Sequence, residues 1–149
     1  MPRARNAWIL AVLIVVVSIV ASLDTSRGQF GYSTYSVHGV YRITYTGINL
    51  PEGLPESGIG IFVADGVGNI TGNTVLNLPG LFCPDVKLTA TYSIDGNGFG
   101  RMSAEFMSPI TGCSGNFTSS LLVHEGGNLI TAVSNSTRFV VLSEVWRRE

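Results

Sequence analysis

The stretch that decides the fold runs from residue 86 to residue 106 and reads VKLTATYSIDGNGFGRMSAEF. Apolar and polar side chains alternate over 86–94, which is typical of a strand with one buried face. The alternation resumes at 102–106, after the turn sequence DGNG. An Asp-Gly pair between two alternating segments predicts a β-hairpin. We therefore expect two antiparallel strands here, separated by a tight turn.

The same pattern continues on both sides of this hairpin, and no segment after residue 36 has a helical period with capping residues. Successive short strands joined by tight turns predict an all-β domain over 37–149, which follows a linker or N-terminal arm over 23–36. Eight strands are enough to close an antiparallel up-and-down barrel, and a two-sheet sandwich is the alternative. The expected strands are 37–46, 58–64, 69–77, 86–94, 99–106, 115–124, 128–134 and 137–147.

The N-terminus has the layout of a secretory signal peptide. Arg3 and Arg5 precede an apolar stretch over 7–21, which is broken only by Ser18. Fifteen helical residues span about 22 Å, less than a hydrocarbon core of about 30 Å. We expect a signal peptide over 1–22; an uncleaved membrane anchor is the first alternative and a buried core helix the second. In the first two cases the rest is exported, as a secreted, periplasmic or membrane-anchored domain outside the cytoplasm.

The charge balance excludes several classes of partner. Nine basic residues oppose ten acidic ones in the 149-residue chain, so there is no basic excess for nucleic acid. Without Arg3 and Arg5 the net charge is −3, which gives no electrostatic reason to bind a membrane surface or a polyanion. We expect membrane contact only through residues 7–21, if they are not cleaved.

Cys83 and Cys113 are the only cysteines and are predicted to form a disulfide, as paired thiols usually do in an oxidising compartment. Closing this loop would stabilise the fold by about 3–4 kcal/mol. The alternative is a catalytic or metal-binding thiol, but a metal site would need CxxC-like spacing or nearby histidines, and the sequence has neither.

The two ends of the expected barrel differ in their connections. The links over 65–68, 95–98 and 125–127 are tight, whereas those over 47–57, 78–85 and 107–114 are longer and hold five of the six prolines. The two cysteines fall in two of the long links and therefore at the same end. Because longer loops on a rigid scaffold tend to carry binding residues, we expect the ligand opening there. The alternative is that these loops plug the barrel.

The tight-turn end collects the histidines and several acidic residues. A metal site is conceivable there, but nearby arginines would neutralise the acids, so we interpret these as solvated turn residues. We expect no metal and no cofactor. The residues concerned are His38, His124, Asp65, Asp95, Glu125, Arg147 and Arg148.

The expected interior is apolar and aromatic, and serves either as a packed core or as a pocket for an apolar ligand. Its members are Tyr41, Ile43, Tyr45, Ile61, Val63, Leu88, Tyr92, Met102, Phe106, Phe117, Leu121 and Val123. The candidate ligand-binding residues among them are Tyr41, Tyr45, Tyr92, Phe106 and Phe117.

The last two strands carry apolar residues on both faces, so alternation does not decide which face is buried. Glu144 is a candidate acid or base if its face points inward, because burial raises the pKa of a carboxyl group. A second apolar face on these strands predicts cover by the N-terminal arm or a subunit contact. That face comprises Ile130, Val140, Leu142 and Trp146.

The turn-rich segments GVY (39–41), DGVGNITG (65–72), ATYSIDGNG (90–98) and LVHEGG (122–127) resemble exported bacterial proteins with an allene oxide cyclase barrel-like domain. The resemblance covers residues 37–149 and does not include the cysteine pair. It implies an eight-stranded barrel that forms trimers. It also implies a hydrophobic cavity with few polar groups, in which the plant cyclases close a fatty-acid epoxide. No catalytic residue of those enzymes matches a position here. GVY is also similar to the G-x-W of lipocalins and other calycins, with Tyr in place of Trp.

Three hypotheses of function follow. The first is a non-enzymatic exported barrel that binds a small apolar molecule or has a structural role in the envelope. The second is a cyclase or isomerase that works by enclosing an apolar substrate. The third is a protein-interaction module that uses the outer apolar face of the last two strands. No G-x-S-x-G motif and no phosphate-binding glycine loop are present in the sequence.

Overall fold

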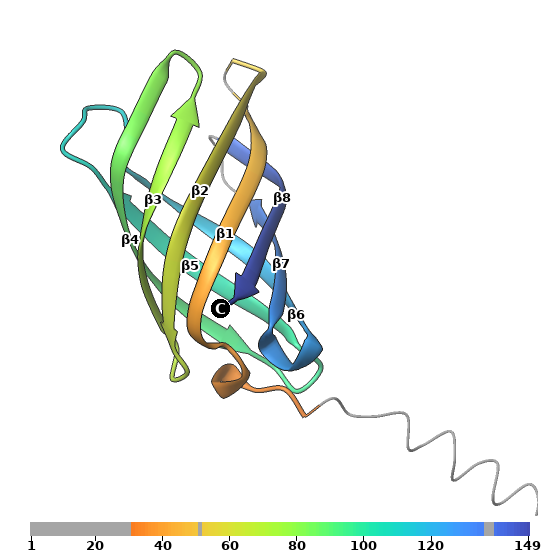
Figure 1. The fold of residues 1–149 in the computed structure, drawn as a ribbon. Coiled ribbons are helices and arrows are strands. Elements are labelled where there is room, and N and C mark those ends of the chain that lie inside the picture. The colour runs from red at the N-terminus through yellow and green to blue at the C-terminus, as the bar shows by residue number, and fades with distance from the viewer. Residues whose placement is uncertain (1–30, 51, 136–138) are drawn as a thin grey trace, which may run out of the picture. The chain divides into compact units, whose positions relative to one another are not determined.

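The computed structural model describes residues 31–50, 52–135 and 139–149. The predicted signal peptide and most of the predicted linker lie outside these residues. Eight strands run antiparallel to their neighbours in chain order, and β8 pairs with β1 to close a barrel (Figure 1). The prediction of an eight-stranded antiparallel up-and-down barrel is therefore confirmed. The strands are β1 (His38–Asn49), β2 (Leu54–Asp65), β3 (Asn69–Leu78), β4 (Leu81–Ile94), β5 (Phe99–Met107), β6 (Gly115–His124), β7 (Leu129–Asn135) and β8 (Phe139–Arg148).

Helical structure in the described part of the chain is limited to two 3₁₀ turns, η1 (Thr34–Ser36) and η2 (Glu125–Gly127). Among the described residues, no helix has the length and apolar character needed to cross a membrane.

The hairpin of β4 and β5 has the buried and exposed faces that its alternation predicts. Val86 and Leu88 are buried, whereas Lys87 and Thr89 between them are exposed. The turn is fixed by Asp95, whose Oδ1 accepts hydrogen bonds from the backbone nitrogens of Asn97 (2.9 Å) and Phe99 (3.0 Å). Such Asx turns let one side chain satisfy the backbone donors of a tight connection.

The same solution recurs thirty residues earlier. Asp65 Oδ1 accepts hydrogen bonds from the backbone nitrogens of Val67 (2.8 Å) and Asn69 (2.9 Å), and Asn69 Nδ2 donates to Oδ2. These bonds, led by the one from the Asn69 side chain, lower the pKa of Asp65 to about 2. Both Asp-Gly segments therefore serve as hairpin turns.

The prediction for the faces of β2 is wrong. Ile61 and Val63, expected inside, are 52% and 47% exposed, whereas Phe62 is 4% exposed and packs edge-on against Trp146. Both faces of β2 are apolar, so alternation alone could not choose between them. The choice is made by the register, because Tyr41 pairs with Phe62 and directly opposed residues share a face.

The prediction that β7 and β8 carry an apolar outer face is also wrong for the two residues whose side chains are described. Ile130 and Trp146 are both 0% exposed and belong to the barrel core. Glu144 shares the inward face of β8 with Trp146 and is 4% exposed. The side chains of Val140 and Leu142 lie outside the described part of the structure.

The end of the barrel that carries the tight turns is covered by the residues just before β1 (Figure 1). Val37 is 0% exposed, and Tyr32 packs against the core. Arg148 Nη2 donates to the carbonyl of Ser36 at 2.7 Å. Gly127 lies so close to this segment that a Cβ there would be 1.9 Å from Ser36 O. Residues 32–37, called the arm below, therefore close this end.

The opposite end has shorter connections than expected. Pairing of β1 with β2 continues to Asn49 and Leu54, and that of β3 with β4 to Leu78 and Leu81. The expected links over 47–57 and 78–85 are therefore mostly strand, and only 108–114 is a longer loop. The prolines in these segments favoured loops in the sequence analysis, but the strands accommodate some of them. Pro84, for example, lies in a β-bulge of β4, one of the few positions where a sheet accepts proline.

Candidate functional site

A cavity of about 420 Å³ occupies the interior of the barrel at the end opposite the arm. The loop over 108–114 contributes Gly112 and Ser114 to its wall. Most of the wall is apolar and comes from the inward faces of β1 to β6. These apolar residues are Ile43, Phe62, Leu76, Leu78, Leu88, Phe106 and Phe117.

Glycines on the inward face of β2 shape one side of this cavity. Gly58 pairs with Tyr45, and a Cβ at Gly58 would lie 2.2 Å from Cε1 of that ring. The Tyr45 ring therefore lies directly over the Gly58 backbone. Gly60 pairs with Ile43 in the same way, and a Cβ there would lie 2.7 Å from Asn73 O. Larger residues at these positions would displace the neighbouring side chain or strand.

Three ionisable side chains enter the cavity from adjacent strands. Tyr45 on β1 pairs with Glu144 on β8, and Gly47, two residues further along β1, pairs with Glu56 on β2. All three ionisable side chains line the cavity. Glu56 is 5% exposed and Glu144 is 4% exposed. Tyr45, Glu56, Glu144 and Asn49 are called the acidic wall below.

Burial raises the pKa of Glu144 to about 7, because an ionised carboxylate loses its hydration inside the barrel. A hydrogen bond of 2.6 Å from Trp146 Nε1 to Glu144 Oε1 acts in the opposite direction. Trp146 is itself held by edge-on contacts with Tyr41 and Phe62. The position of Glu144 Oε1 is therefore fixed by the core, and the carboxyl group changes charge near neutral pH.

The other members of the acidic wall have unsatisfied hydrogen-bonding capacity. Burial raises the pKa of Glu56, whose side chain makes no hydrogen bond or ion pair with another described residue. Burial, and then the charges of Glu56 and Glu144, raise the pKa of Tyr45, so its hydroxyl stays protonated. Asn49 Oδ1 is buried and accepts no hydrogen bond from a described residue. Buried polar atoms usually have a partner, so these groups mark a place where one is expected.

Among the described residues that line the cavity, none is Lys, Arg or His, so the described part of the wall holds no positive charge. Arg148 is used at the opposite end, where its guanidinium lies 5.5 Å from the centre of the Tyr41 ring. Arg42 forms an ion pair with Glu149 on the outside, where its side chain is 76% exposed. No described cation is thus available to neutralise Glu56 or Glu144.

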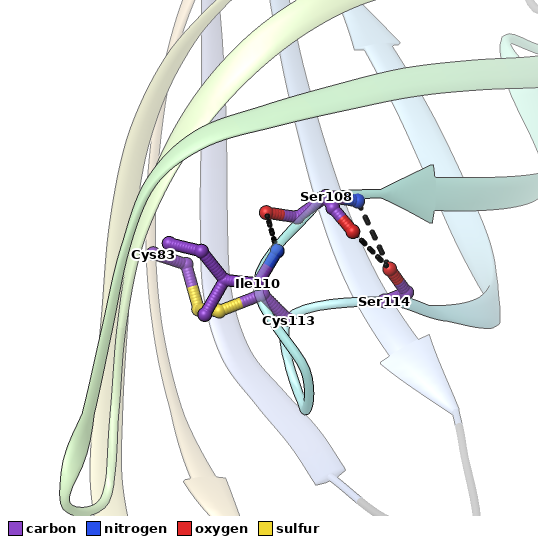
Figure 2. Close-up of a disulfide and its surroundings, with 5 residues drawn as sticks. All are labelled: Cys83, Ser108, Ile110, Cys113 and Ser114. Atoms are coloured by element: carbon purple, nitrogen blue, oxygen red, sulfur yellow. Dashed lines mark hydrogen bonds between the residues drawn. A yellow bond between two sulfur atoms is a disulfide. The ribbon is translucent and has the colours of Figure 1, made fainter.

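A disulfide fixes the rim of the cavity. Cys83 on β4 is bonded to Cys113 in the loop over 108–114, with a Cα–Cα distance of 5.8 Å (Figure 2). The loop is also closed by Ser114 Oγ, which accepts from Ser108 N at 2.9 Å and donates to Ser108 O at 3.2 Å. The predicted disulfide and its position at this end are confirmed. A disulfide is consistent with an oxidising, exported environment.

The structure divides the five aromatic residues predicted to bind ligand between the two ends. Tyr45, Phe106 and Phe117 line the cavity. Tyr41 and Tyr92 lie at the arm end instead. Tyr41 donates to Gly127 O at 2.8 Å, and Tyr92 donates to the carbonyls of Val37 and Thr34. Glu144, the predicted candidate acid or base, is in the cavity.

Sequence reasoning missed Glu56 and Asn49, which fell in the segment expected to be a link. A signal for Glu56 was present. Every second residue back from Phe62 lies on the same face of β2: Gly60, Gly58 and then Glu56. The structure places all four on the inward face. Glycines at two of these positions hid the alternation, because they have no side chain to mark a buried face.

The histidines and acids of the arm end do not come together as a metal site. His38 Nδ1 lies 2.7 Å from Tyr35 O, and His124 Nε2 lies 3.1 Å from Thr131 Oγ1. Within the described ranges no three His, Cys, Asp or Glu residues are close enough to hold a metal ion. Asp65 and Asp95 serve the hairpin turns instead.

Comparison of the chain with protein-family models, curated proteins and solved structures found no match in any of the three.

Proposed function

We propose that this protein is an exported barrel that binds a small, mainly apolar molecule in the cavity at the disulfide end. The observation that carries the proposal is the cavity of about 420 Å³, with a largely apolar wall that includes three phenylalanines. Small-molecule sites typically have volumes of about 300–1,000 Å³, apolar walls and a few convergent polar groups. Protein cores, in contrast, hold few voids larger than a water molecule. The resemblance to allene oxide cyclase-like barrels points to the same kind of site.

The first test uses the neutral fluorescent dye N-phenyl-1-naphthylamine and the full chain, purified under oxidising conditions. We expect saturable binding with one dye per barrel. Leu88→Trp places a larger ring in the cavity and should weaken binding about tenfold or more, because it removes the volume that the dye occupies.

The matched control is Ile61→Trp, which adds the same ring to the outer face of β2, where Ile61 is 52% exposed. Its dye affinity should equal that of the wild type. Both variants keep the apolar segment over 7–21, so dye bound there contributes equally to each. Equal affinities in all three proteins, or no saturable binding, would overturn the proposal.

A second candidate function is proton transfer on an apolar substrate, and the position of Glu144 favours it. A carboxyl group with a pKa of about 7 in a largely apolar cavity is suited to act as a general base near neutral pH. The simplest reaction of this kind is the shift of a β,γ-unsaturated ketone to its conjugated isomer. Glu144 would take the α-proton and return it to the γ-carbon.

Cyclohex-3-en-1-one is a suitable probe, since the conjugated product is followed by its ultraviolet absorbance. We expect a rate above that of buffer in the wild type and none in Glu144→Gln. Equal rates in the two proteins would rule out this second function and would leave the proposal of ligand binding unchanged.

A further inference from the structure

The ionisable groups of the cavity lie on one side. Tyr45 and Asn49 come from β1, Glu56 from β2 and Glu144 from β8, which are neighbouring strands. The opposite wall, from β4 to β6, contributes side chains such as Leu88, Phe106 and Phe117. A ligand that fills the cavity therefore contacts mainly hydrocarbon on one side and both carboxyl groups on the other.

Most oxygen atoms of the acidic wall accept no hydrogen bond from a described residue. The Glu56 side chain, although only 5% exposed, has no hydrogen-bond or ion-pair partner among the described residues. Asn49 Oδ1 is also buried and has no partner in the described part of the chain. Glu144 has one donor, Trp146 Nε1, on one of its two oxygens. The protein supplies a surplus of acceptors here, so the missing component is a donor.

The group that would pair with these oxygens is expected to carry a positive charge. Two buried carboxyl groups line the cavity, and no Lys, Arg or His is present among the described residues of its wall. A buried charge is tolerated when it is paired and hydrogen-bonded, and an ammonium group brings a positive charge with three donors. A ligand carboxylate would instead be repelled by Glu56 and Glu144. A divalent cation such as calcium would require six to eight oxygen ligands, and the mainly apolar wall does not provide them.

We propose that the ligand is a hydrophobic amine, an apolar body with a protonated amino group at one end, and that Glu56 and Glu144 hold this group against the acidic wall. The inference rests on the proposed function, since it names the chemical class of the molecule that the cavity binds. Glu56 and Glu144 attract the ammonium by charge. Asn49 Oδ1 is an additional acceptor on the same wall, and the phenylalanines opposite enclose the hydrocarbon part.

The test compares three probes with the same ten-carbon chain: decylamine, decan-1-ol and decanoic acid. Each is used to displace N-phenyl-1-naphthylamine from the full chain at pH 7.5. We expect decylamine to bind about tenfold more tightly than decan-1-ol, because a charge-assisted hydrogen bond is stronger than a neutral one. Decanoic acid should bind most weakly.

The isosteric variants Glu56→Gln and Glu144→Gln remove one charge each without changing the volume of the cavity. Each should lower the affinity for decylamine about tenfold and change that for decan-1-ol less than twofold. The control is Glu105→Gln on the outer face of β5, where the side chain is exposed, and it should leave all three affinities unchanged.

The possible failures are distinguishable. If neither the dye nor decan-1-ol binds, the proposed binding function itself is wrong. If decan-1-ol binds but decylamine binds no more tightly, the cavity takes a ligand of another class and the inference is overturned. A preference for decylamine that persists in both glutamine variants would also overturn it, because the charge would then be recognised elsewhere.

Discussion

The two ends of the barrel are built from the same eight strands but differ in whether their buried polar groups have hydrogen-bond partners. At the arm end, Tyr92 donates to Val37 O and Arg148 donates to Ser36 O, so buried groups are paired within the chain. At the disulfide end, the Glu56 side chain and Asn49 Oδ1 have no described partner. The arm end is thus completed by the protein's own groups, whereas the disulfide end leaves polar groups that the proposed ligand would pair.

The largest effect is expected where the arm closes the barrel. Gly127 has a φ of +94°, and a Cβ there would lie 1.9 Å from Ser36 O. Gly127→Ala should therefore lower the free energy of unfolding by about 4 kcal/mol, measured by urea denaturation, since backbone strain and a steric clash combine.

The matched control for that variant is Gly126→Ala. Gly126 also has a positive φ, of +67°, but no atom lies within 4 Å of the position of its Cβ. Its loss should be about 1–2 kcal/mol, which is the cost of the left-handed conformation alone. Equal losses in the two variants would mean that the arm does not pack against Gly127 in solution.

At the other end the disulfide is expected to have the next largest effect. Replacing Cys83 and Cys113 together by Ala should lower the free energy of unfolding by about 3.5 kcal/mol, because the 30-residue loop is no longer closed in the unfolded chain. Dye affinity should fall as well, because Gly112 and Ser114 of the released loop line the cavity. A stability loss with unchanged dye affinity would show that the loop position does not depend on the disulfide.

The acidic wall should make stability depend on pH. The pKa of Glu144 is raised to about 7 in the folded protein, so the folded state binds this proton more tightly than the unfolded state does. The stabilisation is complete below the unfolded pKa of 4.5 and is lost as pH rises through 7, to a total of roughly 3 kcal/mol.

Urea denaturation of the wild type and Glu144→Gln at pH 5 and pH 8 measures this contribution. The difference in stability between the two proteins should change in favour of the glutamine variant as pH rises. Gln keeps an oxygen that can accept from Trp146 Nε1, so the variant tests the charge and not the hydrogen bond. A difference that does not vary with pH would mean that Glu144 is ionised in both states.

The smallest expected effect is the difference in unfolding free energy between the variants Tyr92→Phe and Tyr45→Phe. Tyr92→Phe removes a buried hydroxyl that donates to Val37 O, which should cost about 1 kcal/mol in unfolding free energy. Tyr45→Phe removes a hydroxyl that has no described partner and should cost less than about 0.5 kcal/mol. A reversed order would contradict the contrast between the paired arm end and the unpaired cavity end.

The barrel was predictable because β4 and β5 alternate with one apolar face each, and because Asp65 and Asp95 mark tight turns. Strands β2 and β8 were harder, since each offers two apolar faces. The choice between Phe62 and Ile61, or the burial of Glu144, depends on pairing with distant strands such as β1. Part of the cavity was accessible from aromatic residues such as Phe117. Glu56 was not, because Gly58 and Gly60 conceal the alternation that leads to it.

The pairing of β1 with β8, called the seam here, has a consequence for the order in which the barrel forms during synthesis. Tyr45 meets Glu56 through a local hairpin, but it meets Glu144 only when the last strand pairs with the first. Contacts between residues so distant in sequence form slowly, because a long loop must close first. The acidic wall is therefore completed late, and the proposed ligand could bind a nascent chain only after β8 has emerged and paired with β1. Ligand that binds only the closed barrel would then hold the seam shut and slow its opening.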